Sequence, residues 1–506
     1  MIMRKNIFNK TMINITREND VASDIATIKQ PLRRTLVLKQ FCSAMCNSIT
    51  KLNFTYAWAL AFIIMTSSSC KKILDVNSPN AVGDATIFTS VDGLRSARIG
   101  MYSTLQDKNY YGGTYPLLAE CYTDNGTTGG YDVIDLNDIA ARSVQPSNIY
   151  TTGIYSAIYA SIYTANKIIN NIDNVPNVDP TEKSNILGEA LFVRALGEFD
   201  LLRMFGEHWD KTSVYGISIT TVSDQPKVAI ARSTVDDSYK QIISDLQAAI
   251  TSLNTYNGNQ YVSQTAAKAL LARVDLYYGD KTNAASLATD VIGDNTFSLF
   301  GPDNFTSIYT SRLTTESIFE LKFDIQNPSA YNSLTYVRDD ALRTDVAFLA
   351  AADLNTFFQS RPDDKRSALV DYINVDVSIQ PDGRTQKYRG EQTKDNSGFI
   401  IRLAEVYLIR AEALGKTDGL ADLNAIRTSR GMAALASTDV PDDASFLNAV
   451  LDERRAELNF EGHRLFDLAR TNNVSTILGS TVNPIMPIPQ REIEGTNNVV
   501  TQNQGY

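Results

Sequence analysis

Residues 265–292 contain two helical patterns separated by a short break, and this pair constrains the fold more than any other part of the chain. The first pattern is a stripe formed by Ala266, Ala269, Leu270, Arg273, Leu276 and Tyr277. Gly279-Asp280-Lys281 interrupts the helix, and Ala285, Ala288 and Ile292 begin a second stripe. Alanine at contact points lets paired helices approach closely. We therefore expect two short helices joined by a tight turn.

A similar pair recurs near the carboxyl terminus, over residues 402–414 and 420–430. Both pairs resemble a degenerate tetratricopeptide unit, in which two short helices pack through small side chains. Helical periodicity also covers residues 89–105, 155–172 and 182–205. We therefore predict a mainly α fold, built as a tetratricopeptide-like helical scaffold of low regularity.

Two stretches of the chain lack this periodicity. Residues 110–132 are rich in Gly, Tyr and Asp, and we expect them to form a loop. Residues 295–400 contain segments such as 317–323 that alternate as strands do, and polar stretches separate these segments. We interpret this range as a variable insertion of loops and short strands. The predicted divisions are a helical scaffold over 78–294 and 401–475, the insertion over 295–400, and a closing segment over 476–506.

The amino-terminal segment ends in a cysteine that follows an apolar run. Residues 54–65 are apolar but too few to span a bilayer core of roughly 30 Å, and small residues then lead to Cys70. This pattern resembles a lipoprotein signal, in which cleavage precedes the cysteine and fatty acyl chains such as palmitate modify it. Residues 1–69 are then an upstream extension and signal segment, and Cys70 anchors residues 70–506 to membrane lipid. The alternative is an ordinary signal peptide with an incidental cysteine.

Charge balance and the scarcity of metal-binding residues exclude several classes of function. The formal net charge is −10, and residues 1–69 carry nine Lys/Arg but only three Asp/Glu, so the remainder is more acidic still. Such a surface disfavours nucleic acid, which proteins bind largely through Lys and Arg. The chain has only His208 and His463, and its four cysteines lack zinc-site spacing. We therefore expect no nucleic-acid partner, no metal site and no cofactor.

Motifs near the carboxyl terminus resemble the closing signature of the SusD/RagB family. They are residues 451–470, Pro487-Ile-Pro-Gln490 and Gln502-Asn503-Gln-Gly-Tyr506, and they occur in the family's order. Residues 70–76, 189–196 and 402–431 are similar too, so the resemblance covers essentially all of residues 70–506. It implies a surface-exposed outer-membrane lipoprotein that captures glycan oligomers, or less often peptides, for nutrient uptake. The implied partner is a SusC-like TonB-dependent transporter barrel, for which the protein acts as a lid.

Charged residues crowd the first of these motifs. They are Asp452, Glu453, Arg454, Arg455, Glu457, Glu461, Arg464 and Asp467. Neighbours three and four apart on a helix form ion pairs, and we interpret the set as such a structural network. Paired carboxylates also occur in glycoside hydrolases, but no catalytic motif accompanies them here, so we expect a binding protein and not an enzyme. A tetratricopeptide-type scaffold that binds a protein without handling nutrients is the other alternative.

Candidate ligand-binding residues come from two loops that carry tyrosines. Sugar rings have apolar faces and hydroxyl edges, so a carbohydrate site combines aromatic side chains with amide and carboxylate groups. The first loop offers Tyr122, Asp124, Asn125, Tyr131 and Asp132, in a region where members of the family often place part of the ligand site. The insertion, which we expect on the ligand side, offers Tyr331, Asn332 and Tyr336. Binding residues concentrate in loops because a scaffold can hold the loops' geometry while their sequences vary.

Overall fold

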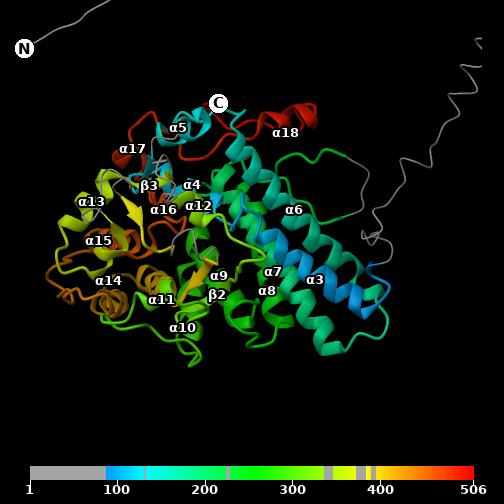
Figure 1. Cartoon of the computed structure of the whole chain (residues 1–506), viewed down its shortest axis with the longest axis horizontal. Coiled ribbons are helices and arrows are strands. Elements are labelled where there is room, and N and C mark those ends of the chain that lie inside the picture. The colour runs from blue at the N-terminus through cyan, green and yellow to red at the C-terminus, as the bar shows by residue number, and fades with distance from the viewer. Residues whose placement is uncertain (1–86, 130–132, 224–227, 336–345, 372–382, 389–394) are drawn as a thin grey trace, which may run out of the picture. The chain divides into compact units, whose positions relative to one another are not determined.

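Helices dominate the part of the chain that the computed structural model describes, which comprises residues 87–129, 133–223, 228–335, 346–371, 383–388 and 395–506 (Figure 1). The longer helices are α3 (Val91–Leu105), α4 (Thr114–Cys121), α6 (Ile149–Asn171), α7 (Pro180–Phe205), α8 (Val235–Ser252), α9 (Gln264–Tyr278), α10 (Lys281–Ile292), α13 (Ala352–Gln359), α14 (Leu403–Ser429) and α15 (Asp443–Leu458). The shorter ones are α5 (Ile134–Ala140), η2 (Ile172–Asn174), α11 (Ser307–Thr310), α12 (Tyr331–Thr335), η3 (Lys365–Leu369), α16 (Arg464–Arg470), α17 (Val474–Ile477) and α18 (Gln490–Gly495). No described helix is both long and apolar enough to cross a membrane. The prediction of a mainly α fold is confirmed.

Successive helices pack against one another in the order of the chain. Contacts run from α6 to α7, α8, α9 and α10, and they continue to α14 and α15. Helix α3 packs against α6, and Figure 1 shows α3, α6, α7 and α8 as neighbouring helices. This stacking buries one large apolar core, and a separate cluster lies between α14 and α15.

The helix pair expected over residues 265–292 is present as α9 and α10. The Ser263 hydroxyl caps the amino end of α9, because it accepts a hydrogen bond from the Ala266 amide at 3.1 Å. Gly279 ends the helix with a φ of 91°, a left-handed conformation that glycine adopts without a Cβ clash. Ala269 and Ala288 are fully buried, as expected for residues on the two stripes.

The second expected pair forms the two halves of α14, which meet at Gly415. Its φ of 71° and ψ of −175° are not helical, so the chain changes direction there. In the second half, a Cβ added to Gly419 would lie 2.2 Å from the Ala411 carbonyl oxygen of the first half. The two halves therefore approach so closely that only glycine fits at this point of the second half.

The strands are short and pair in twos within the described residues. They are β1 (Gly126–Gly129), β2 (Ser317–Leu321), β3 (Val346–Ala350), β4 (Val370–Asp371), β5 (Arg384–Thr385) and β6 (Gly398–Arg402). The antiparallel pairs are β1–β3, β2–β6 and β4–β5. Strand β2 confirms the strand expected over residues 317–323. The β2–β6 pair leads into α14, whose first amide, that of Leu403, donates to the Glu316 carbonyl at 2.9 Å.

The expectation that residues 110–132 form a loop is wrong for much of that stretch, because it contains α4 and β1. The hydroxyls of Tyr110, Tyr111 and Tyr115 donate to the Asp200 carboxylate of α7 at 2.6, 2.8 and 3.0 Å. All three tyrosines are buried. The polar composition that predicted a loop instead provides hydrogen bonds inside the core.

The closing segment is attached to the end of α7. The Met486 amide donates to the Met204 carbonyl at 2.8 Å. The Asn503 side-chain amide donates to the carbonyls of Phe205 and Met486 at 2.9 and 2.8 Å. Residues 486–489 form no helix or strand. The tail motif therefore fixes this proline-containing segment against the helical scaffold.

Candidate functional site

The two candidate loops meet at the strand pair β1–β3. Strand β1 comes after Asn125 and before Tyr131 of the first candidate loop in the sequence, and it pairs antiparallel with β3 of the insertion. The Ala351 amide, just after β3, donates to the Asn125 carbonyl at 2.9 Å. At the start of the second candidate segment, the Ala330 amide donates to the Gly112 carbonyl at 2.8 Å. Segments far apart in the sequence are thus joined at their bases.

Asp124, just before β1, is buried and held by two arginines of the carboxyl-terminal motif. Its carboxylate accepts hydrogen bonds from Arg464 Nε and Nη2 at 2.9 Å each, and it lies 3.0 Å from Arg455 Nη2. Burial opposes ionisation, but the hydrogen bonds and charges of Arg464 and Arg455 outweigh it and lower the pKa of Asp124. Because Arg455 lies on α15 and Arg464 begins α16, the motif positions the base of the first loop.

Asn125 and Tyr122 are also used inside the protein, and both are fully buried. The Asn125 side chain donates to Glu120 at 2.8 Å and accepts from Arg455 Nε at 2.8 Å. The Tyr122 hydroxyl donates to a backbone carbonyl of the closing segment at 2.9 Å, and burial raises the pKa of Tyr122 to about 12. Their polar groups therefore hold the base of the loop in place.

Glu120 of α4 is a residue of this site that the sequence interpretation missed. One carboxylate oxygen accepts the amides of Gly462, His463 and Arg464 at 3.1, 2.9 and 3.3 Å. Burial raises the pKa of Glu120, although these hydrogen bonds act in the opposite direction. The sequence did indicate this role of Glu120. It directly follows the apolar residues Leu117-Leu118-Ala119, and an acidic side chain in a buried stretch needs hydrogen-bond or charged partners.

Tyr331 packs inside the protein at the base of the second loop. Its ring stacks on Tyr388, with centroids 4.1 Å apart and an interplanar angle of 12°. The Tyr331 hydroxyl donates to the Tyr111 carbonyl at 3.0 Å, and the Tyr388 hydroxyl donates to the Phe460 carbonyl at 2.8 Å. Both rings are buried, so they support the loop and offer no exposed face to a sugar.

The structure thus corrects part of the predicted ligand site. Four candidates are buried structural residues whose polar groups are already bonded within the protein, namely Tyr122, Asp124, Asn125 and Tyr331. Residues Tyr131, Asp132 and Tyr336 lie outside the described residues, as do the Asn332 side chain and Cys70. A sequence pattern that marks a loop with polar residues does not distinguish a side chain at the loop's base from one at its tip.

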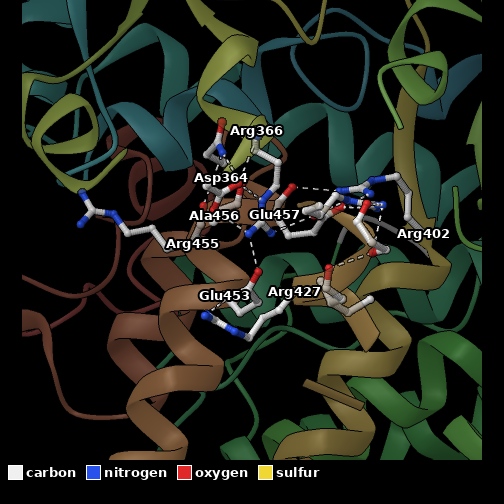
Figure 2. A network of polar contacts seen from close by, with 12 residues as sticks. Asp364, Arg366, Arg402, Arg427, Glu453, Arg455, Ala456 and Glu457 are labelled. Atoms are coloured by element: carbon white, nitrogen blue, oxygen red, sulfur yellow. Dashed lines mark hydrogen bonds and ion pairs between the residues drawn. The ribbon is translucent and has the colours of Figure 1, made fainter. Parts of the chain in front are cut away.

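Glu453 and Glu457 of α15 face a buried network of charges, which Figure 2 shows, whereas Asp452 of the same helix is exposed. Glu457 accepts hydrogen bonds from Arg366 Nη1 at 3.0 Å, Arg402 Nη1 at 2.8 Å and Arg430 Nη2 at 2.9 Å. Glu453, one turn earlier, also pairs with Arg366. The prediction of a structural ion-pair network is confirmed. The expected geometry was wrong for these two acids, because their partners come from η3 and the residues just before it, from β6 and from the end of α14, and not from neighbours on the same helix.

Within this network, each carboxylate is neutralised by guanidinium groups. Burial alone would raise the pKa of Glu457, but the charges of Arg430, Arg402 and Arg366 hold it well below its usual range. Glu453 and Glu457 are fully buried and paired, so neither is available to a substrate. In the described ranges, no group of three or more His, Cys, Asp or Glu side chains is arranged to hold a metal ion.

Two family models match the sequence. One is described as starch-binding and associating with the outer membrane, and it matches residues 72–276. The other is described as the SusD family, and it matches residues 369–506. Two relatives from Formosa agariphila are similar over most of their length. SusD-like protein P2 is 25% identical over 89% of this chain and 99% of its own, and SusD-like protein P38 is 23% identical over 83% and 92%.

Solved structures share the fold. A SusD superfamily protein from Bacteroides thetaiotaomicron is 27% identical, with a TM-score of 0.72, and the match covers 82% of this chain and 99% of that one. A laminarin-binding SusD-like protein is 23% identical, with a TM-score of 0.70, and the match covers 83% of this chain and 100% of that one. The helical fold of this chain therefore follows an architecture already seen in experimental structures.

Proposed function

This chain belongs to the SusD/RagB family, and we propose that it is a lipid-anchored protein of the outer membrane that captures carbohydrate at the cell surface. The family model described as starch-binding and the laminarin-binding structural neighbour support a carbohydrate ligand. The cysteine expected to carry acyl chains, Cys70, supplies the anchor. We expect a binding protein and not an enzyme, because Glu453 and Glu457 of its carboxyl-terminal motif are buried in ion pairs.

The observation that carries this proposal is the joining of two sequence-distant loops at β1–β3. The scaffold fixes the bases of both loops through the Asp124 ion pairs and the stacked rings of Tyr331 and Tyr388. A site built on a rigid base loses less conformational entropy when its ligand binds. The arrangement suits a ligand site formed jointly by the two loops.

We place ligand contact on Tyr131, Asp132, Asn332 and Tyr336, the remaining candidates, whose side chains lie outside the described part of the chain. Tyrosine rings stack on the apolar faces of sugars, while the carboxylate and the amide bond to hydroxyls. Replacing Tyr131 or Tyr336 with Ala is expected to weaken binding roughly tenfold, as loss of one aromatic contact costs about 1.4 kcal/mol.

Calorimetric titration of the purified chain with laminarin- and starch-derived oligosaccharides measures this effect. Tyr163→Ala is the matched control, because Tyr163 is an exposed tyrosine of α6 that belongs to neither loop. Isotherms that are unchanged for both Tyr131→Ala and Tyr336→Ala would reject the placement of the site. Binding of peptides but not glycans would favour a peptide-capturing member of the family, and release of sugar products would favour a glycoside hydrolase.

The proposed capture mechanism is the one that the resemblance to the family implies. We propose that the chain covers the mouth of a SusC-like TonB-dependent transporter barrel, so that ligand is enclosed between the two proteins. Such a lid needs a complementary surface that buries more than roughly 1,000 Å² in the closed state. The transporter supplies the energy for import, while the lid contributes affinity and selectivity.

A further inference from the structure

A groove separate from the two loops lies between α6 and α18. Its volume is about 1000 Å³, and its walls include Tyr155 and Tyr159 of α6, Val228 and Ile230 of a neighbouring segment, and Glu492 of α18. Ligand sites for small molecules usually enclose roughly 300–1,000 Å³. The groove is therefore large enough for more than one sugar ring.

A second hollow extends the groove along α6. It has a volume of about 490 Å³ and lies between the first turns of α6 and the other side of α18. Thr152, Ser156 and Arg491 line both hollows, so the two are continuous. The lining positions of α6 run from Ile149 to Tyr159, which is about 15 Å at 1.5 Å per residue. This shape fits an elongated ligand.

The lining alternates aliphatic edges with hydrogen-bonding groups. Val228, Ile230 and Val499 are 66%, 45% and 41% exposed, which is high for aliphatic side chains that line one hollow. The same lining includes the polar side chains of Thr152, Ser156, Thr220, Thr496 and Asn497 and the charged groups of Arg491 and Glu492. Apolar ring faces and hydroxyl edges of a sugar require this mixture.

One buried hydroxyl in the lining lacks a partner. The Ser218 side chain is 8% exposed, and its Oγ makes no hydrogen bond within the described part of the chain. Its backbone carbonyl accepts from the Tyr159 hydroxyl at 3.2 Å, which places Ser218 beside the α6 wall. Buried polar groups are nearly always satisfied, so an unpaired hydroxyl in the wall of a groove points to a polar occupant.

We propose that this groove is a second carbohydrate site, which binds a neutral oligosaccharide along α6. This inference rests on the proposed function, because it assigns a further surface to the same class of ligand. Charge argues against an anionic chain, since Arg491 is outnumbered by Glu492 and by Glu494 of the second hollow. An anionic glycan would instead require an excess of Arg and Lys.

Ser156→Trp tests the proposal, because Ser156 is exposed and lines both hollows. Its hydroxyl only bonds back to the Thr152 carbonyl at 2.9 Å, so the larger side chain blocks the groove without removing a tertiary contact. Ser96→Trp is the matched control, since Ser96 is an exposed residue of α3 whose hydroxyl bonds to the Asp92 carbonyl at 2.8 Å. Thermal melting checks that both variants remain folded.

The readouts are calorimetry with neutral laminarin and starch oligosaccharides and with a uronate oligosaccharide, together with hydrogen exchange. We expect Ser156→Trp to remove one binding event or weaken it at least tenfold, while Ser96→Trp binds as the wild type does. Neutral ligand should also slow amide exchange over residues 149–159 and 490–499 in the wild type.

Three results would overturn the inference. If the wild type binds oligosaccharide, but Ser156→Trp binds equally well and these residues gain no protection, the groove is not a site and the proposed function survives. If the wild type binds none of the neutral oligosaccharides, the proposed function and the inference fail together. If the uronate chain alone protects the groove, the assignment to a neutral ligand is wrong.

Discussion

Glu457 has three buried cationic partners, whereas a simple ion pair has one. Arg366, Arg402 and Arg430 all donate to its carboxylate, and all four side chains are buried. Breaking a buried pair by removing one partner is costly, because it leaves an uncompensated charge in a region of low polarity. The residue therefore joins η3, β6 and the end of α14 to α15.

Glu457→Gln tests this role. We expect the free energy of unfolding to fall by about 3–5 kcal/mol, since three guanidinium groups would lose their shared anion. Urea unfolding at neutral pH measures the change. Asp92→Asn, which removes an exposed carboxylate paired with Arg95, serves as the control and should change stability little. A similarly small loss for Glu457→Gln would contradict the account.

His208 predicts a pH dependence of stability. Its ring is buried with neither nitrogen hydrogen-bonded in the described structure, and burial lowers the pKa of His208 to about 3. An unfolded histidine titrates near pH 6.5, so below that pH the unfolded chain takes up a proton that the folded chain refuses. The free energy of unfolding is therefore not reduced by His208 above about pH 6.5, and it falls as the pH decreases from 6.5 towards 3.

Replacing His208 with Phe removes this titration. The variant should gain about 2 kcal/mol relative to the wild type between about pH 7 and pH 5, because each pH unit below 6.5 is worth roughly 1.4 kcal/mol. Urea unfolding of both proteins at the two pH values provides the comparison. A stability difference that stays constant with pH would show that the buried ring does not resist protonation.

Some residue contacts could not be predicted because the partners lie far apart in the chain. The sequence identified Asp124 as polar and in a loop, but nothing near it indicated that Arg464 would neutralise it. Likewise, the charges of α15 predicted ion pairs, whereas the partner of Glu457 on β6 becomes visible only in the folded protein. Local spacing reports on neighbours along a helix and not on tertiary partners.

At the scale of elements, periodicity predicted several of the helices but not α8. The alanine stripes of α9 and α10 and the alternation of β2 each matched an observed element. Helix α4 was missed because its turns lie in a stretch rich in Gly and Tyr, whose tyrosines bond to Asp200 in the core. Composition therefore predicts secondary structure poorly where polar side chains form hydrogen bonds inside the core and not with water.

The two halves of α14 provide a test of helix packing. Gly419→Ala should destabilise the protein by about 1–3 kcal/mol, because the added Cβ meets the Ala411 carbonyl oxygen at 2.2 Å. Gly100→Ala in α3 is the counterpart, since nothing lies within 4 Å of a Cβ there. It should stabilise the helix by roughly 0.5–1 kcal/mol. The packing of α14 would be contradicted if thermal unfolding showed that both substitutions stabilise the protein, or that both destabilise it.

At the scale of the whole molecule, the helical scaffold supports the two candidate loops. The carboxyl-terminal motif lies far from the loops in sequence, but its Arg455 and Arg464 hold Asp124 at the base of the first loop. The motif therefore acts as a positioning device for the proposed site, and the loops are free to differ in sequence.

Cys70→Ala tests the proposed anchor. Without the acylated thiol, the protein should leave the outer-membrane fraction and lose incorporation of labelled palmitate, because the acyl chains on Cys70 are its proposed attachment to the membrane. Cys121→Ala is the control, since Cys121 is a free cysteine buried in α4 and should leave labelling unchanged. Retention of the label in Cys70→Ala would place the anchor elsewhere.

The most direct test of the central claim is to isolate the anchored chain from outer membranes in mild detergent with bound glycan, and to determine the structure of the assembly. We predict a transporter barrel whose mouth is covered by this chain, with glycan enclosed between the two proteins and in contact with the loops that follow β1 and precede β3. A chain that purifies without a barrel, or that holds no ligand at that interface, would contradict the account.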